Sequence, residues 1–475
     1  MKAYALMMTA SALVLSACAA GPDYTAPAAP VTTHYDQEAE SKLGVTLGGK
    51  AEGDWWSVFR SARLDEVMRR AIAGNLDLAA ADATIAQANE AVASARGGLS
   101  PQIDYGAGLG RQRLDSPPQP GASTYYAIGA QVSFDPDIFG GTHRAIEQKE
   151  AFAEFQKRRY DAAYLTLTGD VASEVILLAS ARAQIDAVGT LLADDRKTVE
   201  LVRLAHSAGS VTQLEVALAE TQLAQDETLL PPLALQRETA RHALSILAGT
   251  GPADWRAPDF DLSDLSLPAN LPVSLPAELA HDRPDILEAE AELHAASAEV
   301  GVATANLYPR LTLSASLTQA AAEPGSLLEP GSLFWGVATG LTGPLFHGGS
   351  LQADRRGAVD TYKASLARYR QTVVRSFGQV ADLLQAIDRH AEERSSQERA
   401  LASAEVSLRL NQGGYRGGEI GVIEVLDAQR AYQRALLGQI KVRTAQYLDA
   451  VQLSVALGGN SVGADQQTAS SGDQN

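Results

Sequence analysis

Two carboxylates, Glu424 and Asp427, are the side chains whose type and spacing most directly suggest chemistry. Residues three apart in an α-helix lie on one face, so both side chains would point in the same direction. If several chains assemble around an axis with this face inward, the carboxylates form stacked acidic rings. Such rings attract cations, and their mutual repulsion opposes tight closure. The alternative, which the sequence alone favours, is a solvated outer face of the helix.

No set of residues suited to catalysis or metal binding accompanies this pair. The eight histidines are scattered, and none stands at metal-ligand spacing from acidic residues or from the single cysteine. Gly106, Gly108 and Gly110 lie inside an alternating strand pattern rather than at the strand-to-helix turn of a nucleotide-binding loop. The formal charge of −18 argues against nucleic acid as a partner. We therefore expect neither an enzyme nor a bound cofactor.

Two very long helices are expected to position the acidic pair. After Gly141 no proline occurs until Pro231, and none occurs after Pro344. Thr142–His206 and Ser350–Gln412 are therefore predicted to be helices, each about 95 Å long at about 1.5 Å per residue. Helices of this length with Ala, Leu and Val over much of their surface must bury that surface against neighbours.

A glycine-marked turn and a returning helix follow each long helix. The turns are Ala208–Ser210 and Gly413–Gly418. The adjacent prolines Pro231 and Pro232 are expected to break the first returning helix, whereas the second is expected to run unbroken. The acidic pair stands just past the second turn.

Alternating apolar residues between Pro101 and Gly141 predict two amphipathic β-strands joined by a turn-rich loop. One face of this hairpin would carry Ile103, Tyr105, Ala107 and Leu109, followed by Tyr126, Ile128, Ala130, Val132 and Phe134. About ten residues tilted by about 45° rise about 24 Å, close to the apolar thickness of a bilayer. Strands of a soluble sandwich alternate in the same way and are the alternative.

This pattern returns later in the chain at a nearly constant offset. A shift of 208 places Pro101 on Pro309, and past the second turn a shift of 209 places Glu215 on Glu424. Such a shift indicates an internal duplication. The resulting four strands cannot close a barrel, and an open sheet edge cannot face lipid. Membrane strands would therefore require several chains to share one barrel.

The first residues of the chain predict export. Residues 1–17 combine Lys2 with an apolar run too short to span a bilayer, which is typical of a secretory signal peptide. The small residues before Cys18 resemble a bacterial lipobox, which implies cleavage before Cys18 and its acylation with palmitate-type chains. Lipoproteins that are retained in the inner membrane typically carry aspartate at the position of Ala19. The outer membrane is therefore the expected location of this protein. An ordinary cleavage site beside an incidental cysteine is the alternative.

The composition indicates how the rest of the chain is organised. Apolar residues make up 45% but aromatic residues only 6%, which suits helices packed through small side chains. Beyond the signal no apolar run is long enough for a membrane helix, so any crossing would use strands. The expected segments are a lipidated arm (18–61), repeat 1 (62–250, strands about 102–112 and 124–134, helical hairpin about 142–250), a linker (251–275), repeat 2 (276–459, strands about 310–319 and 332–342, helical hairpin about 350–458) and a disordered tail (460–475).

Four short motifs make a family resemblance specific. They are Trp55-Trp56 with Phe59, Arg283-Pro-Asp-Ile286, Pro344-Leu-Phe-His-Gly-Gly349 and Val425-Leu-Asp-Ala-Gln-Arg430. Together they resemble the TolC-like outer membrane efflux proteins, in particular their lipoprotein (NodT) branch, from Gly21 to Gly459. The resemblance implies a mainly α-helical fold with membrane β-strands. It also implies a homotrimer whose twelve-stranded barrel continues into a periplasmic α-helical barrel.

The same resemblance implies a periplasmic entrance at the helical turns. Tyr415, Glu424 and Asp427 fall on entrance-lining positions, and Glu215 falls on the corresponding acidic position of the first repeat. Ile420 stands where some members carry an arginine that ties the entrance shut. Closure would therefore rest on Tyr415 and on packing.

These observations lead to an expected function as the passive exit duct of a tripartite efflux pump for small molecules such as drugs. The implied partners are a periplasmic adaptor protein and an inner-membrane transporter, of the resistance-nodulation-division type given the lipoprotein character. A type I secretion component is one alternative. A coiled-coil adaptor or scaffold lipoprotein without a pore is another, although no biotinyl-lipoyl-like domain accompanies the hairpins.

Overall fold

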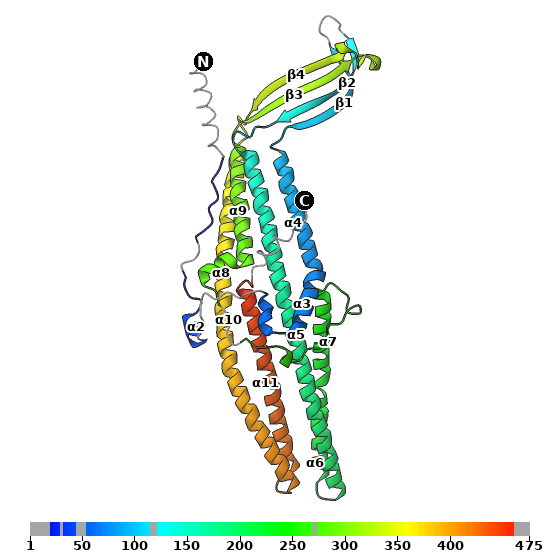
Figure 1. Cartoon of the computed structure of the whole chain (residues 1–475), viewed down its shortest axis with the longest axis vertical. Helices are drawn as coiled ribbons and strands as arrows, with labels where there is room; N and C mark the ends of the chain where they lie inside the picture. Colours follow the sequence, from blue (N-terminus) through cyan, green and yellow to red (C-terminus); the bar gives the residue numbers. More distant parts are fainter. Residues whose placement is uncertain (1–19, 29–31, 44–53, 115–120, 269–272, 460–475) are drawn as a thin grey trace. The chain divides into compact units, whose positions relative to one another are not determined.

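The computed structural model describes residues 20–28, 32–43, 54–114, 121–268 and 273–459 (Figure 1). The predicted signal peptide, Cys18 and the C-terminal tail lie outside these residues. The chain divides into two compact units, which we describe separately. The strand unit comprises Met1–Ala28, Asp82–Arg158 and Glu288–Gln371, and the tip unit comprises Ala29–Ala81, Arg159–Leu287 and Thr372–Asn475. Each unit therefore contains segments of both sequence repeats.

The strand unit contains one antiparallel sheet of four strands in the order β1-β2-β3-β4 (Figure 1). The strands are β1 (Gln102–Leu114), β2 (Gly121–Phe134), β3 (Arg310–Ala321) and β4 (Leu333–Thr342). Two short 3-10 turns, η3 (Pro324–Ser326) and η4 (Pro330–Ser332), lie between β3 and β4. The two predicted hairpins, one from each repeat, thus join edge to edge through β2 and β3.

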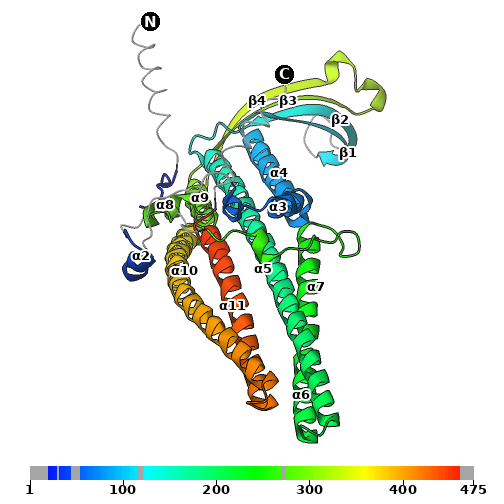
Figure 2. The same ribbon diagram turned by 60° about the horizontal axis from the view of Figure 1, so that its bottom comes forward.

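The register of this sheet places the alternating apolar residues on one face. Tyr105 pairs with Ala130, Ala130 with Leu317, and Leu317 with Trp335. Residues directly opposite one another in a ladder project to the same side. The other face carries polar and small residues, as in the row Asp104, Gln131, Ser316 and Gly336. The strands curve together, as Figure 2 shows.

The apolar face is exposed, and the sheet has two open edges. Tyr105, Trp335 and Val337 are 76–90% exposed. Among the described residues, no strand pairs with the outer edge of β1 or of β4. This face and these edges therefore lack the contacts that would cover them in a protein stable as a single soluble chain.

In the strand unit, the N-terminal arm is bound to the first turn of a long helix. The backbone N–H of Ala20 donates to the Phe139 carbonyl at 2.9 Å, and Arg144 donates to the Ala20 carbonyl and to Asp23 at 3.1 and 2.6 Å. Gly21 has a φ of +92°, and a Cβ there would lie 2.4 Å from the Cα of Gly301. The arm approaches this closely because both positions lack side chains.

Four helices contribute to this unit and continue beyond it. They are α4 (Leu76–Gly97), α5 (Gly141–Ser207), α9 (Pro284–Ala305) and α10 (Ser350–Arg416). The helices α5 and α10 were predicted at 142–206 and 350–412, and both contain 67 residues. Each therefore rises about 100 Å along its axis.

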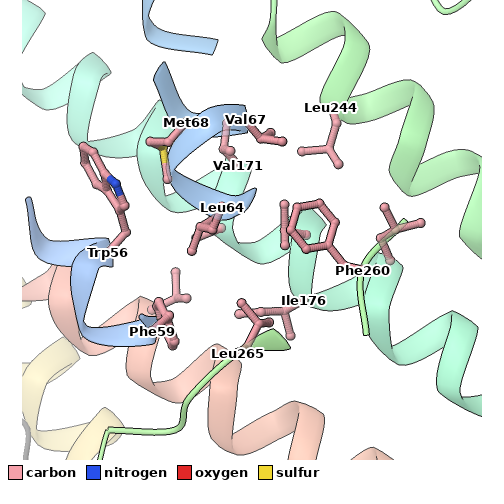
Figure 3. Packing of buried hydrophobic residues seen from close by; sticks show 14 of the residues in the cluster. Trp56, Phe59, Leu64, Val67, Met68, Val171, Ile176, Leu244, Phe260 and Leu265 are labelled. Atoms are coloured by element: carbon pink, nitrogen blue, oxygen red, sulfur yellow. The ribbon is translucent and has the colours of Figure 1, made fainter. Parts of the chain in front are cut away.

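The tip unit is built on an aromatic and aliphatic core (Figure 3). Trp55, Trp56 and Phe59 form the 3-10 turn η1 (Trp55–Phe59) and are buried, so this motif packs into the core. The Trp55 Nε1 donates to Thr168 at 3.1 Å, and the Tyr447 hydroxyl donates to the Leu265 carbonyl at 2.7 Å. The polar edges of these large side chains are thus satisfied inside the core.

The tip unit contains further helical elements. They are α2 (Gln37–Leu43), α3 (Ala62–Gly74), α6 (Gln213–Glu227), α7 (Leu230–Leu247), η2 (Leu262–Asp264), α8 (Pro276–Asp282) and α11 (Val422–Ala456). The first returning helix is interrupted between α6 and α7, just before Pro231 and Pro232, while α11 is continuous. Both outcomes match the proline pattern.

One sequence expectation was wrong. Among the described residues, α5 contains a stretch that is long and apolar enough to cross a membrane, although no such stretch was expected beyond the signal. Half of that stretch is buried within the protein. Val171, Val175 and Leu178 of α5 are fully buried in the core. The apolar character of α5 is therefore explained by packing.

We expect Gly301→Val to release the N-terminal arm. A Cβ at this position would meet the Arg144 side chain at 2.7 Å and the Ala20 carbonyl oxygen at 3.1 Å, so a larger side chain must displace one of them. Overpacking of this kind costs about 1–3 kcal/mol. Cleavage beside Tyr24 by chymotrypsin should therefore become about tenfold faster. The control is Gly97→Val, where a Cβ has no atom within 4 Å; equal cleavage of the two variants would contradict the contact.

Candidate functional site at the helical turns

The turn of the first repeat is closed by a left-handed glycine and a complete helix cap. Gly209 has a φ of +76°, and the N–H of Ser210 donates to the Ala205 carbonyl at 2.9 Å, which ends α5. Thr212 then caps α6. Its hydroxyl accepts from the Glu215 N–H at 3.4 Å, and its own N–H donates to the Glu215 carboxylate at 2.6 Å. Glu215 is thus held in a reciprocal capping box.

The turn of the second repeat has the same backbone design but lacks this cap. Gly418 has a φ of +75°, and the N–H of Glu419 donates to the Gly414 carbonyl at 2.9 Å. The residue at the cap position of α11 is Gly421, which has no side chain to accept from the helix N–H groups. Glu424 occupies the position equivalent to Glu215, is exposed, and has no side-chain hydrogen bond within the described residues.

The two turns pack against each other through a small apolar cluster. Its buried members come from α5, α6 and α11: Val199, Val202, Val216, Ala219, Val422 and Leu426. Tyr415 of the second repeat is half-buried against this cluster. Burial raises the pKa of Tyr415, and the charge of the Glu215 carboxylate raises it further. Tyr415 therefore packs against a cluster that contains Val216, the residue after Glu215 in the chain.

Asp427 is part of a chain of polar contacts between the repeats. Arg430 donates to the Asp427 carboxylate at 2.9 Å, one helical turn away on α11. The same guanidinium also donates to the side-chain carbonyl of Gln222 on α6. Asp427 remains 66% exposed, so this ion pair neutralises it only in part.

The structure brings the four expected entrance residues to one end of the tip unit. Glu424 and Asp427 share an exposed face of α11, as their spacing predicts. Ile420 lies beside Gly414 in the turn, because a Cβ added at Gly414 would lie 3.4 Å from the Ile420 side chain. The contribution of Arg430 was not recognised from the sequence, although its position three residues after Asp427 could have indicated an ion pair.

The chemistry available in this region is electrostatic. Within the part of the chain that the structure describes, no group of three or more His, Cys, Asp or Glu side chains is arranged to hold a metal ion. A cavity of about 650 Å³ lies between α5, α10 and α11. Its lining is mixed, with apolar residues such as Leu191 and Leu436 beside the charged Asp194, Glu405 and Arg409.

The fold and these turns are those of an outer membrane channel. A solved structure of the outer-membrane channel OprN superposes with a TM-score of 0.86 at 26% identity, over 93% of this chain and 99% of that one. The pyoverdine export outer membrane protein OpmQ of Pseudomonas aeruginosa is 29% identical over 96% of each chain. The toluene efflux pump outer membrane protein TtgF of Pseudomonas putida is 30% identical over 97% of each.

The model of the outer membrane efflux protein family matches residues 67–250 and 275–459. The chain belongs to this family. The protein is therefore an efflux channel component of the outer membrane. This assignment replaces the alternative of a coiled-coil adaptor without a pore.

We expect Thr212→Ala to loosen the start of α6. Loss of a threonine cap costs about 1 kcal/mol, which should make amide hydrogen exchange in the first turn of α6 about fivefold faster. Thr221→Ala is the matched control, because the Thr221 hydroxyl only donates to the Ala217 carbonyl of the same helix. Unchanged exchange in the Thr212 variant would show that the capping box does not stabilise the turn.

Proposed function

We propose that three copies of this chain form a continuous exit duct from the periplasm to the outside. The observation that carries this proposal is the sheet of four strands, with an exposed apolar face and two unpaired edges. An unpaired edge cannot remain in lipid because its N–H and C=O groups have no water there. Pairing β1 of one copy with β4 of the next satisfies both edges, and three copies supply a twelve-stranded barrel. Twelve strands lie within the range of known membrane barrels.

The helices would then line the periplasmic part of the duct. In this arrangement the turns form its entrance, with Tyr415, Glu424, Asp427 and Glu215 around the opening. The exposed carboxylates of α11 would concentrate cations there. The packing of Tyr415 against the apolar cluster of the turns would hold the entrance narrow.

The N-terminal segments would attach the duct to the membrane. Residues 1–17 would be removed as a signal peptide, and Cys18 would carry the acyl chains. The observed binding of Ala20 beside Phe139, five residues beyond β2, would keep this anchor near the strands. The arm would extend to residue 61. A linker at 251–275 would join the two repeats.

The proposed partners complete a tripartite pump. An inner-membrane transporter, of the resistance-nodulation-division type, would drive export. A periplasmic adaptor would connect the two. OpmQ is described as a pyoverdine export protein and TtgF as part of a toluene efflux pump. These descriptions support small organic molecules as the cargo of this chain.

A charge placed on the apolar face of the sheet should prevent channel assembly. Ala130 and Gln131 are exposed neighbours on β2 that project to opposite faces. Ala130→Arg would place a cation in lipid at a cost of about 2–4 kcal/mol in each chain, so we expect loss of trimers and of current in planar bilayers. Gln131→Arg, facing the duct, should retain trimers and alter only ion selectivity. Equal behaviour of both variants, or a wild-type monomer without conductance, would contradict the proposal.

Removing the exposed carboxylates of α11 should weaken cation selectivity. With Glu424 and Asp427 both replaced by alanine, the opening loses negative charge and mutual repulsion, so the preference for cations should fall several-fold and the resting conductance should change. The measurement is the reversal potential in a salt gradient. Glu38→Ala combined with Glu66→Ala removes the same charge at exposed positions far from the turns in sequence. If the pair at the turn has no greater effect than this control, it faces outward.

A further inference from the structure

A group of buried polar side chains lies behind the exposed carboxylates of α11. Its members are Asp195 of α5, Gln222 and Asp226 of α6, and Gln429 of α11, and each is at most 4% exposed. Burying four polar residues at the junction of three helices is costly unless each one finds a partner. Their hydrogen bonds therefore show which protonation states the fold can hold.

Asp226 is held as an acceptor. One carboxylate oxygen accepts from the Gln222 amide at 2.6 Å, and the other accepts from the Gln433 amide of α11 at 3.0 Å. Both oxygens are thus bound by N–H donors, one from each repeat. This arrangement suits an ionised carboxylate.

Asp195 has the opposite environment. Neither of its oxygens receives an N–H or O–H donor, and it makes no ion pair within the described residues. The ion pair between the adjacent residues Arg196 and Glu227, at 3.0 Å, holds this part of α5 against the end of α6, and the charge of Asp226 acts on Asp195. Two carboxylates in contact in a buried site cannot both be ionised at low cost. A proton on Asp195 removes the conflict, because the carboxyl group then donates to Asp226.

The charges around the pair do not relieve this conflict. On α5, Asp194 adds negative charge beside Asp195. Lys197 forms its ion pair with Asp194 and not with Asp195. Arg196 of α5 is bound to Glu227 of α6. On α11, Arg430 is bound to Asp427 and Gln222.

The remaining neighbour, α10, also leaves the pair without a cation. Glu405 and Arg409 of α10 line the cavity that Gln429 and Gln433 also line, and neither makes an ion pair with Asp195. Burial, followed by contact with Asp226, raises the pKa of Asp195 to about 7.

We propose that Asp195 and Asp226 form a proton-binding site that holds α5 against α6 when it carries one proton and loosens this contact when the proton leaves. Loss of the proton places two negative charges against each other between α5 and α6. Asp226 is tied to α11 through Gln433, and Gln222 leads through Arg430 to Asp427. Repulsion at the pair therefore reaches an expected entrance-lining residue. The consequence for current rests on the proposed function, but the proton site itself does not.

The direction of the pH dependence follows from proton linkage. The carboxyl of Asp195 titrates near pH 7 in the folded protein and near about 3.9 when unfolded. The folded state therefore binds the proton more tightly, and stability is fully present below about pH 4 and is lost as the pH rises to about 7. Alkaline conditions should accordingly weaken the junction and open the entrance.

Asp195→Asn tests the site, because an asparagine amide donates to Asp226 at any pH. We expect the thermal midpoint of the wild-type trimer to fall by a few degrees relative to Asp195→Asn between about pH 5 and pH 8. We also expect wild-type conductance to rise over this interval while that of Asp195→Asn stays constant. Asp186→Asn, an exposed neighbour on α5 with a side chain 69% accessible, is the control and should follow the wild type.

Parallel midpoint profiles of the wild type and Asp195→Asn would overturn the proton site. A difference in midpoint without any pH dependence of current would overturn its coupling to the entrance. Absence of current from the wild type at every pH would instead contradict the proposed function, while the midpoint profiles would still decide whether the proton site exists.

Discussion

The requirement that every backbone N–H and C=O group in lipid be hydrogen-bonded governs this protein. Each chain supplies four strands whose apolar residues meet in register, but the outer edges of β1 and β4 have no partner within the described residues. Satisfying those edges makes the sheet dependent on other copies. The long helices inherit that dependence, because α5 follows β2 and α10 follows β4 directly in the chain. The two hairpins thus supply one open edge each.

Much of the fold is predictable from local pattern. Strand alternation predicts the apolar face because side chains alternate strictly in a sheet. The absence of proline from 142 to 230 predicts α5, and Pro231-Pro232 predict its interrupted return. The shared face of Glu424 and Asp427 follows from their spacing. The contact of Arg430 with Gln222 joins residues 208 apart and depends on how two hairpins pack. The lack of hydrogen-bond donors at the buried Asp195 carboxyl likewise depends on how three helices pack. No local sequence pattern can therefore predict it.

Polar groups serve two different purposes near the turns. The exposed carboxylates of α11 lie in solvent, where water screens their charges. Buried groups between α5, α6 and α11 determine which helix arrangements are tolerable, because each needs a partner. Arg430 links the two sets through Asp427 and Gln222.

The two repeats begin their returning helices differently, with Thr212 and a bound Glu215 in one and Gly421 and a free Glu424 in the other. In a ring of three chains, six such helix starts alternate around the axis. The backbone approaches sixfold symmetry, but the chemistry at the rim retains only a threefold axis. Two interleaved sets of three positions result, one rigid and one adjustable. A docking protein could therefore distinguish alternate positions on a rim that is almost uniform in outline.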